Sequence, residues 1–360
     1  MSLNSTLIWR KVSYEAQALL ALCKLPFSKQ ALLEHLSRCM PTVNIETTNI
    51  CNANCTFCAY QYQDRPTGTM TLDLFRRVVD QYVECGGGPL GLTPTVGDPL
   101  VDKHLLDRLA YAKSKQAITS ISMYSNMISL NRWGARALVG SGLSHLVVST
   151  SGFDEEMYQR VYRSKMYKQV FRHIKEFAVE NRAAGGPVDV TIDMRIDRPL
   201  AEVQASRDYQ EVSHLIGADR MGVKFRYDSW AGKIQQSELT GTMRLRSNAD
   251  LRFPRISACS QMYRGPAVYW DGKVGACACR DVDARELLIG DVNTQHLGEI
   301  WFGQELRKLR EEFLTDRCRQ ICQGCSHYSN LSVYLRRDFR EKLAALRPVP
   351  GYDVSVDSLR

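Results

Sequence analysis

The sequence predicts an α/β protein in which a parallel sheet forms an open barrel, followed by a small cysteine-rich domain. Short β-rich runs alternate with helical patterns between residues 42 and 230, and six such strand–helix units can be distinguished. Repeated units of this kind imply a parallel sheet. Nine of the twelve cysteines fall into two groups, one early and one late in the chain. Grouped cysteines in a chain of this size indicate metal binding rather than disulfides.

Five segments are expected along the chain. Residues 1–40 carry apolar stripes at helical spacing, and Pro26 is expected to break this helix. The stretch before the second cysteine group is polar and rich in arginine, without a clear period, which is typical of a linker. The expected segments are an N-terminal helical segment at 1–40, a barrel at 41–230, a linker at 231–258, a cluster-binding domain at 259–330, and a final helix and tail at 331–360.

The helix over 71–85 is the clearest element of the barrel. Thr71 can cap it, apolar residues repeat at helical spacing along it, and Gly86 begins the run of glycines that ends it. The first cysteine group follows the first strand, and in barrels of this kind the chemistry lies on the loops that follow the strands. The other helices are expected at 103–115, 133–139, 154–163, 167–182 and 203–215, and the strands at 43–48, 90–96, 118–124, 146–149, 188–196 and 222–227.

The composition is that of a soluble globular enzyme. Hydrophobic residues make up 44% and charged residues 24% of the 360 residues, which is ordinary. No apolar run reaches the roughly 18 residues that a membrane span needs, and no secretory signal is visible, so a cytoplasmic location is expected. The net charge of +8 comes from scattered Lys and Arg. It fits a solvated surface or an anionic substrate, and nucleic acid is the weaker alternative because no nucleic-acid module is visible.

Cys51, Cys55 and Cys58 form a C-x3-C-x2-C group with no fourth cysteine nearby. Three thiolates close in sequence can hold three irons of a cubane cluster, one iron each. The fourth iron then stays open to a small molecule, which is the arrangement that reductive cleavage of a sulfonium requires. A zinc knuckle is the alternative, but it would want a fourth ligand close by.

This group, with Phe57 at its aromatic position shortly after the first strand, resembles the signature of the radical S-adenosylmethionine (radical SAM) superfamily. The resemblance implies a partial (β/α)6 TIM-like barrel. It implies a [4Fe-4S] cluster and S-adenosylmethionine (SAM) as cofactors, and a 5′-deoxyadenosyl radical that abstracts a hydrogen atom. It also implies an external electron donor such as flavodoxin or ferredoxin.

Residues 96–100 resemble the family segment Gly-Gly-Glu-Pro, whose backbone and acid receive the ammonium group of SAM. Val96 and Asp98 depart from that pattern, but a carboxylate one methylene shorter still suits an ammonium group. The role is therefore carried over to Gly97 and Asp98, with a plain turn as the alternative. The other positions that the resemblance assigns to the cofactor lie on later strands, where capping of loops is the alternative role; they are Ser125, Asn126, Ser149 and Arg195.

The second group resembles the SPASM or twitch extension of radical SAM enzymes, which holds auxiliary iron–sulfur clusters, over roughly residues 259–328. An Asp-Gly hairpin leads to the second cysteine of the group, and a helix starting near Leu297 leads back to the last pair. Cys279 and Cys318 could each replace a neighbouring ligand or belong to a second, incomplete cluster, and a structural zinc is the alternative. The ligands expected for one auxiliary [4Fe-4S] cluster are Cys259, Cys277, Cys322 and Cys325.

The first hypothesis for function is a redox step, of the dehydrogenase type, on a small polar metabolite such as a sugar or an aminocyclitol. It rests on residues 1–40, which are too short for the peptide-binding module of many peptide-modifying relatives. Tyr227 and Asp228, at the end of the sixth strand, are expected on the substrate side. Modification of a ribosomal peptide is the second hypothesis. The third is epimerisation, in which Cys279 returns a hydrogen atom to the substrate, and a non-enzymatic iron–sulfur or zinc scaffold is a different class of alternative.

Overall fold

A parallel six-stranded sheet forms the centre of the molecule. The computed structural model describes residues 3–246, 257–278, 280–313 and 315–352. Strands β1 to β6 pair in parallel and in sequence order, which confirms the predicted α/β class with a parallel sheet. These strands are β1 (Val43–Ile45), β2 (Gly88–Gly91), β3 (Ile118–Ser125), β4 (His145–Ser151), β5 (Asp189–Arg195) and β6 (Met221–Lys224).

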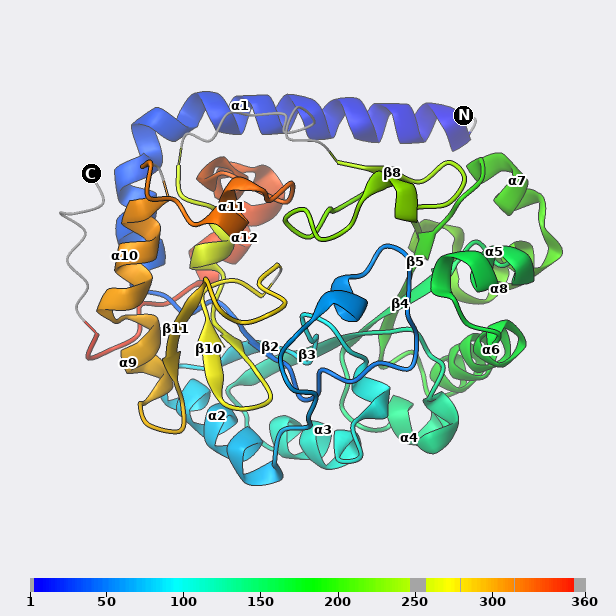
Figure 1. Cartoon of the computed structure of the whole chain (residues 1–360), viewed down its shortest axis with the longest axis horizontal. Coiled ribbons are helices and arrows are strands. Elements are labelled where there is room, and N and C mark those ends of the chain that lie inside the picture. Colours follow the sequence, from blue (N-terminus) through cyan, green and yellow to red (C-terminus); the bar gives the residue numbers. More distant parts are fainter. Residues whose placement is uncertain (1–2, 247–256, 279, 314, 353–360) are drawn as a thin grey trace.

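The helices of the barrel lie outside this sheet, and α2, α3, α4 and α6 follow one another around its outer side in Figure 1. The predicted cap of α2 is confirmed, because the Thr71 hydroxyl accepts a hydrogen bond from Leu74 N at 3.2 Å. The buried face of α2 consists of hydrophobic and aromatic side chains, and burial of each large one contributes about 1.5–3 kcal/mol to the stability of the fold. The helices are α2 (Leu72–Glu84), α3 (Leu105–Lys113), α4 (Ala135–Val139), α5 (Glu155–Tyr162), α6 (Tyr167–Ala183), α7 (Leu200–Ala205) and α8 (Arg207–Ile216).

The cysteine-rich region extends the same sheet. Strand β9 (Ala267–Val268) pairs in parallel with β1, and β10 (Lys273–Gly275) and β11 (Leu288–Asp291) continue the order outward. The predicted Asp-Gly hairpin is confirmed as the β9–β10 turn, where Gly272 has a φ of +94°. Its attachment to β1 was not predicted. The late cysteine group is thereby held beside the strand that leads into the early one.

Several predicted strand ends need correction. Strand β2 stops at Gly91, before Pro94, which has no N–H to give to a strand ladder. Gly97 and Asp98 therefore lie in a loop that leads into the short helix η2 (Pro99–Val101), and not at the end of the strand. Ser149 lies inside β4 and does not end it.

The predicted sixth strand and last barrel helix are each divided in two. The sheet strand ends at Lys224, and Tyr227 belongs to a separate short strand, β7 (Arg226–Tyr227), which pairs with β8 (Arg244–Leu245). The helix expected over 203–215 is interrupted at Ser206. This residue is extended and caps α8, because its hydroxyl accepts a hydrogen bond from Tyr209 N at 3.2 Å.

The N-terminal helix α1 (Leu3–Ser37) runs through Pro26, so the predicted break is wrong. A proline removes one backbone hydrogen bond and usually bends a helix rather than ending it when both sides stay packed. Figure 1 shows α1 crossing one end of the molecule and then turning down beside the C-terminal helices. Its buried leucines join a second core with the C-terminal region. The C-terminal helices are α9 (Leu297–Trp301), α10 (Gln304–Glu312), α11 (Gln320–Gln323), η8 (Leu331–Leu335) and α12 (Arg337–Ala345).

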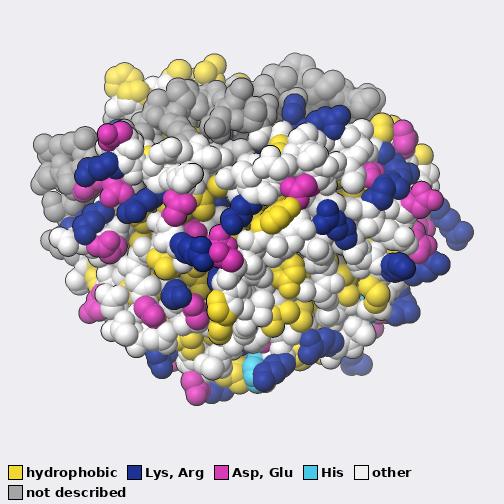
Figure 2. Space-filling view, in the orientation of Figure 1, with side chains coloured by type: hydrophobic (Ala, Val, Ile, Leu, Met, Phe, Trp, Pro, Cys, Tyr) yellow, Lys and Arg dark blue, Asp and Glu magenta, His cyan; other side chains and the backbone are white. Residues whose placement is uncertain are grey.

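Among the described residues, no helix combines the length and the apolar character that crossing a bilayer requires. Figure 2 shows Lys and Arg side chains interspersed with Asp and Glu over the visible face, without a continuous basic field.

Candidate active site

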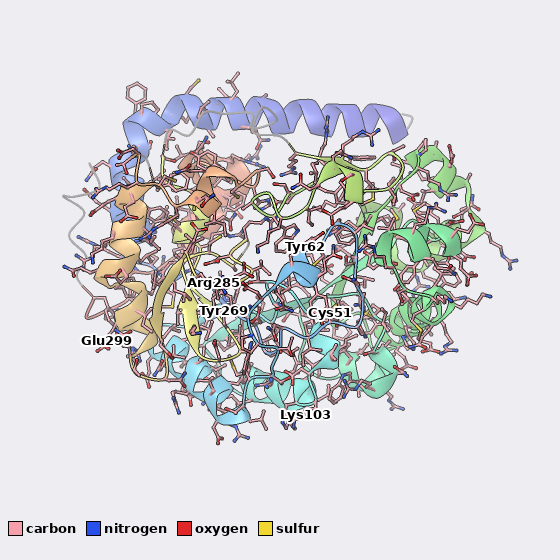
Figure 3. The ribbon with its side chains drawn as sticks, in the orientation of Figure 1. Cys51, Tyr62, Lys103, Tyr269, Arg285 and Glu299 are labelled. Carbon is pink, nitrogen blue, oxygen red and sulfur yellow. The ribbon has the colours of Figure 1, made fainter. Side chains whose placement is uncertain are left out.

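The three early cysteines lie on the loop between β1 and η1 (Ala59–Tyr62). Figure 3 labels Cys51 in this loop and Tyr62 at the end of η1. The loop turns tightly, with Cys58 N donating to Cys55 O at 3.2 Å. Burial raises the pKa of the Cys55 thiol, and the charges of Cys58 and Cys51 raise it further. Burial likewise raises the pKa of Cys51 to about 12. The three sulfur atoms therefore lie within electrostatic reach of one another in a largely water-excluded place.

Three cysteines at this spacing in the sequence can each bind a different iron of one cluster. In the part of the chain that the structure describes, no three His, Cys, Asp or Glu side chains converge closely enough to hold one ion. A zinc ion would need sulfurs about 4 Å apart, because each Zn–S bond is about 2.3 Å long. In an iron–sulfur cube each thiolate binds a different iron, so the sulfurs stand further apart.

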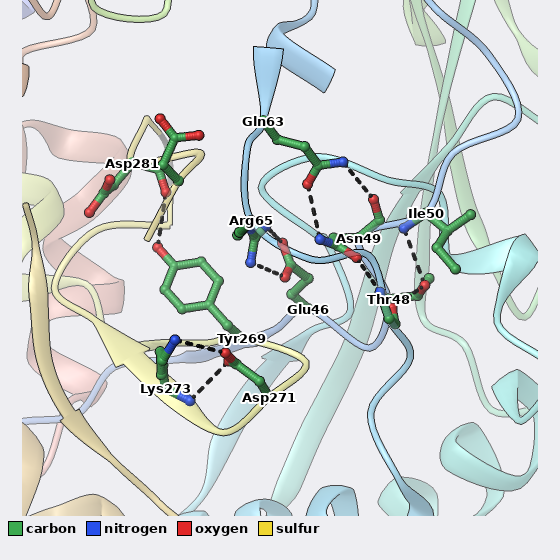
Figure 4. A network of polar contacts seen from close by, with 12 residues as sticks. Glu46, Thr48, Asn49, Ile50, Gln63, Arg65, Tyr269, Asp271, Lys273 and Asp281 are labelled. Atoms are coloured by element: carbon green, nitrogen blue, oxygen red, sulfur yellow. Dashed lines mark hydrogen bonds and ion pairs between the residues drawn. The ribbon is translucent and has the colours of Figure 1, made fainter. Parts of the chain in front are cut away.

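Buried polar contacts hold both ends of this loop (Figure 4). Arg65 donates two hydrogen bonds of 2.6 Å to the Glu46 carboxylate. The Arg65 guanidinium also lies over the ring of Tyr269, 4.9 Å from its centroid, so the β9–β10 hairpin supports the loop. Across the loop, Asn49 Nδ2 donates to Gln63 Oε1 at 3.0 Å. These contacts therefore fix both ends of the loop that carries the cysteines.

Gly97 and Asp98 lie beside the cysteine loop. Gly97 has a φ of +123°, and a Cβ atom on it would lie 2.8 Å from Thr48 O, so only glycine fits this close approach. Asp98 N donates to Ile50 O at 2.9 Å. The segment predicted to bind SAM thus packs on the residue directly before Cys51.

The buried Asp98 carboxylate accepts hydrogen bonds from Leu100 N at 2.9 Å, Ser125 Oγ at 3.0 Å and Asn126 N at 2.7 Å. A carboxylate has about four acceptor positions, so one remains for a ligand. Burial raises the pKa of Asp98 to about 6, and these hydrogen bonds oppose the rise. The side-chain Nδ2 of Asn126 donates a hydrogen bond to Cys51 Sγ at 3.7 Å. Three predicted cofactor residues and the first cysteine therefore form one connected group.

Phe57 is the centre of a second connected group. Its ring lies 5.3 Å from the Arg195 guanidinium, 5.8 Å from the ring of Tyr227 and 5.4 Å from the ring of Tyr162. The Tyr162 hydroxyl is 2.9 Å from Ser149 Oγ. Ser149, Arg195 and Tyr227 come from different strands, yet they gather around this one aromatic ring. Burial raises the pKa of Tyr227, which keeps its hydroxyl protonated.

The late cysteines line a single cavity. Arg280 and His327 also lie in its wall. Cys318 is buried in the cluster against which Cys259 and Cys322 pack, and its Sγ lies 3.9 Å from Arg319 O. Cys279 lies outside the described residues. The cysteines in the wall are the four expected to hold the auxiliary cluster, Cys259, Cys277, Cys322 and Cys325.

A strained turn touches both cysteine loops. Trp230 Nε1 donates to the carbonyl of Phe57, inside the first loop, at 3.0 Å. In the second loop, Gly324 approaches Ala231 so closely that a Cβ atom on it would lie 3.3 Å from Ala231 O. Trp230, Ala231 and Gly232 have φ angles of +52°, +55° and +94°. Left-handed conformations cost non-glycine residues of order 1–3 kcal/mol each and cluster at functional sites.

Arg280 lies between the two cysteine groups. Its guanidinium stacks over Trp230, 4.7 Å from the ring, and its Nε is 2.7 Å from Asp228 Oδ1. Burial raises the pKa of the Cys58 thiol, and the charge of Arg280 opposes this rise. Asp228 Oδ2 also accepts a hydrogen bond from Ser326 Oγ at 3.0 Å. Asp228, expected on the substrate side, is therefore bonded to the loop that carries the last two cysteines.

The comparisons with family models and curated proteins match both cysteine regions. Residues 45–194 match the model of the radical SAM superfamily, and residues 259–326 match that of SPASM, an iron–sulfur cluster-binding domain. The chain is 28% identical to the GTP 3′,8-cyclase of Chlorobaculum tepidum over 40% of this chain and 43% of the relative. It is 26% identical to the PqqA peptide cyclase of Bradyrhizobium diazoefficiens over 53% of this chain and 48% of the relative. The chain thus spans about half the length of these curated relatives.

Two solved structures share the fold at low sequence identity. Streptococcus suis SuiB bound to precursor peptide SuiA has a TM-score of 0.58 at 14% identity, covering 85% of this chain and 72% of that one. BtrN in complex with AdoMet and 2-DOIA has a TM-score of 0.51 at 15% identity, covering 81% and 94%. Radical SAM and SPASM domains imply a SAM-binding [4Fe-4S] cluster, SAM itself and an auxiliary cluster. The chain belongs to the radical SAM superfamily and carries a SPASM iron–sulfur domain after its barrel.

Proposed function

We propose that this radical SAM/SPASM enzyme removes a hydrogen atom from a substrate C–H bond and completes a two-electron oxidation of a small polar metabolite. The observation that carries the proposal is the contact of Trp230 and Arg280 with both cysteine sites. One molecule bound beside these residues can reach both sites. It can lose a hydrogen atom on the barrel side and an electron on the SPASM side.

Oxidation of an alcohol carbon would remove one hydrogen atom, one proton and one electron from the substrate, and each of them has an acceptor. With SAM and both clusters bound, reductive cleavage of SAM supplies the abstracting radical, and one electron comes from an external donor such as flavodoxin or ferredoxin. The substrate gives one hydrogen atom to become part of 5′-deoxyadenosine. The substrate would then lose its hydroxyl proton to solvent and one electron, for which an auxiliary cluster held by the late cysteines would be the acceptor, and its C–O single bond would become a carbonyl.

The chain's own residues would hold and orient these groups. Cys51, Cys55 and Cys58 would ligate the first cluster. The remaining acceptor position of Asp98 suits the ammonium of SAM, and Arg195 beside Phe57 suits its carboxylate. Tyr227 would act as a wall of the substrate pocket rather than as a base, because burial raises its pKa. The auxiliary cluster would be held by Cys259, Cys277, Cys322 and Cys325.

Four cysteines around one cavity favour oxidation over the alternatives. A cluster ligated by four thiolates has no open iron, which suits it to accepting an electron rather than to binding substrate. Peptide modification remains the second candidate, supported by the likeness to the PqqA peptide cyclase. Epimerisation would depend on Cys279, which lies outside the described residues.

Anaerobic reconstitution separates these outcomes. The loaded enzyme with dithionite and SAM should form 5′-deoxyadenosine, and a substrate panel of alcohols should yield a product lighter by two hydrogen atoms in mass spectrometry. Cys51→Ala should abolish 5′-deoxyadenosine, and Cys322→Ala should retain it but lose the oxidised product. Cys85→Ala, which alters a buried cysteine outside both groups, is the matched control. A product that keeps all its atoms but has one carbon-bound hydrogen replaced by deuterium from heavy water, and is heavier only by that exchange, would point to epimerisation and contradict the oxidation.

A further inference from the structure

One side of the early cysteine loop faces solvent. Asn52 directly follows Cys51, Asn54 directly precedes Cys55, and both asparagines are exposed. Cys55 is buried and Cys51 is partly buried. The proposed function needs one electron from an external donor, and that electron has to reach the cluster that these thiols would hold. Because each asparagine is the chain neighbour of a thiol, this side of the loop offers a short route for the electron.

Two other segments border this exposed side. Asn52 Nδ2 donates to Ser129 Oγ at 2.8 Å, which places the loop after β3 against the cysteine loop. Thr56 N donates to Val161 O at 2.9 Å, which places the end of α5 against the same loop further along the chain. A partner that approaches the exposed asparagines therefore meets the loop after β3 and the end of α5 as well.

Both bordering segments lie in parts of the chain without acidic residues. No Asp or Glu occurs between residues 108 and 153 or between residues 157 and 175. Arg132 is exposed in the first of these stretches. Its backbone N–H donates to Ser129 O at 3.1 Å, and its Nη1 donates to Val101 O at 2.8 Å. The guanidinium is therefore attached to the end of η2, beside the loop that contacts the cysteine loop.

Arg163 and Lys165 bring positive charge to the other border. Arg163 ends α5 with a φ of +48°, and its Nη1 donates to Gln61 Oε1 at 2.8 Å, so its guanidinium is attached to η1. Gln61 Nε2 also donates to Glu238 at 3.4 Å, which puts a carboxylate at that edge without an ion pair to the arginine. Lys165 is exposed. The ion pairs found among the described residues do not involve Arg132, Arg163 or Lys165, so these charges stay available to a partner.

We propose that a cationic face beside the early cysteines is the docking surface for an acidic protein that donates one electron. This inference rests on the proposed function, which needs such a donor. Carboxylates of a partner complement unpaired cations that surround an uncharged centre. Such attraction raises the association rate and weakens as the ionic strength rises. Redox partners form small, transient interfaces, so the effect belongs mainly to the rate of encounter. The cationic face consists of Asn52, Asn54, Arg132, Arg163 and Lys165.

Reduction rates with two different reductants test the docking surface. The anaerobic, cluster-loaded enzyme is mixed with reduced flavodoxin, an acidic protein, or with photoreduced deazariboflavin, a small uncharged reductant that needs no docking. Freeze-quench electron paramagnetic resonance follows the first cluster, whose signal is identified by its loss in Cys51→Ala. Arg132→Glu and Arg163→Glu should each lower the rate with flavodoxin about tenfold at low ionic strength, and added salt should narrow the difference. The rate with deazariboflavin should stay unchanged.

Two further variants make the result decisive. Lys165→Glu changes an exposed side chain and should slow reduction by flavodoxin in the same way. Arg77→Glu makes the same charge change on α2, which lies on a different side of the barrel from α5 (Figure 1), and should keep the wild-type rate. Melting temperature and iron content show whether each variant is folded and loaded.

Three results would overturn the docking surface. They are equal flavodoxin rates in the wild type and the variants of the cationic face, an equally large loss with deazariboflavin, and a wild type that deazariboflavin reduces but flavodoxin does not. If the rates change as expected but SAM yields no 5′-deoxyadenosine, the proposed function fails while the docking surface stands.

Discussion

Replacement of Asp98 by Asn tests how the barrel binds SAM. The carboxylate accepts three hydrogen bonds from the chain and keeps about one acceptor position for a ligand. An asparagine has almost the same shape but no charge, and its amide nitrogen can only donate. It would therefore lose the charge-assisted bond to the ammonium of SAM and turn a donor toward Ser125 or Asn126.

The size of the effect follows from these contacts. A hydrogen bond to a charged group contributes about 1.5–3 kcal/mol, so the dissociation constant of SAM should rise about 10- to 150-fold. The mismatched donor should also lower the free energy of unfolding by about 1–3 kcal/mol. This loss is opposed by a gain of similar size, because holding Asp98 ionised with a pKa of about 6 instead of 3.8 costs about 3 kcal/mol, so the net change in the free energy of unfolding should be small.

Equilibrium binding of SAM to the anaerobic, cluster-loaded enzyme measures the first effect, and denaturant unfolding measures the second. Ser125→Ala is the matched control, since it removes one donor to Asp98 and keeps the charge. It should change SAM affinity by only a few fold. If folded Asp98→Asn binds SAM as tightly as the wild type, Asp98 does not receive the ammonium, and its role is confined to capping η2 and the loop after β3.

The pH dependence of the same site has a definite sign. Because burial raises the pKa of Asp98 to about 6, the carboxyl takes up a proton as the pH falls below 6, and SAM affinity should then fall by up to tenfold per pH unit. Asp98→Asn should abolish this slope. For folding the sign is opposite: between pH 6 and about 4 the folded state binds more protons than the unfolded state, so this group adds stability as the pH falls.

Three other predictions follow from buried or bridging side chains. Arg280→Met removes a positive charge beside both cysteine sites. It should lower the reduction potentials of both clusters by up to about 60 mV, which is a tenfold change in a one-electron equilibrium. Potentiometric titration measures this shift, and Arg285→Met, which changes an exposed arginine, is the control. Arg108→Met leaves Asp102 buried without its 2.7 Å partner and should cost about 3–5 kcal/mol in denaturant unfolding, so a loss below 1 kcal/mol would contradict the structure. Cys322→Ala should reduce iron content by about one cluster per chain, and an unchanged iron content would exclude this residue as a ligand.

The sequence predicts the strands and helices of the barrel well because each buries a patterned face that is visible locally. It predicts element ends less well. Pro26 lies inside α1 without ending it, since packing against the C-terminal core compensates for one lost hydrogen bond. Lys224 ends the sixth sheet strand earlier than expected because the chain turns to pair Tyr227 with β8. Both outcomes depend on partners that lie far away in the sequence.

In the candidate site, residues that lie in sequence motifs were predicted, and residues that only the fold brings there were not. Asp98, Ser125 and Asn126 were predicted from motifs at strand ends, and the structure brings them together beside Cys51. Tyr162, Trp230 and Arg280 were missed because they belong to no motif. A tryptophan and an arginine in polar stretches carry no local signal, and only the fold brings them against Phe57 and Asp228.

The two cysteine loops are held relative to each other by contacts from separate parts of the chain. Strand β9 pairs with β1, Arg65 packs on Tyr269, and Trp230 joins the first loop to the turn beside Gly324. Loss of one of these contacts leaves the other two in place, so a single substitution in this set should shift the loops little. Combined substitutions should cost more than their sum, because residues in one network are not additive. The relative position of the two cysteine loops therefore depends on these contacts together.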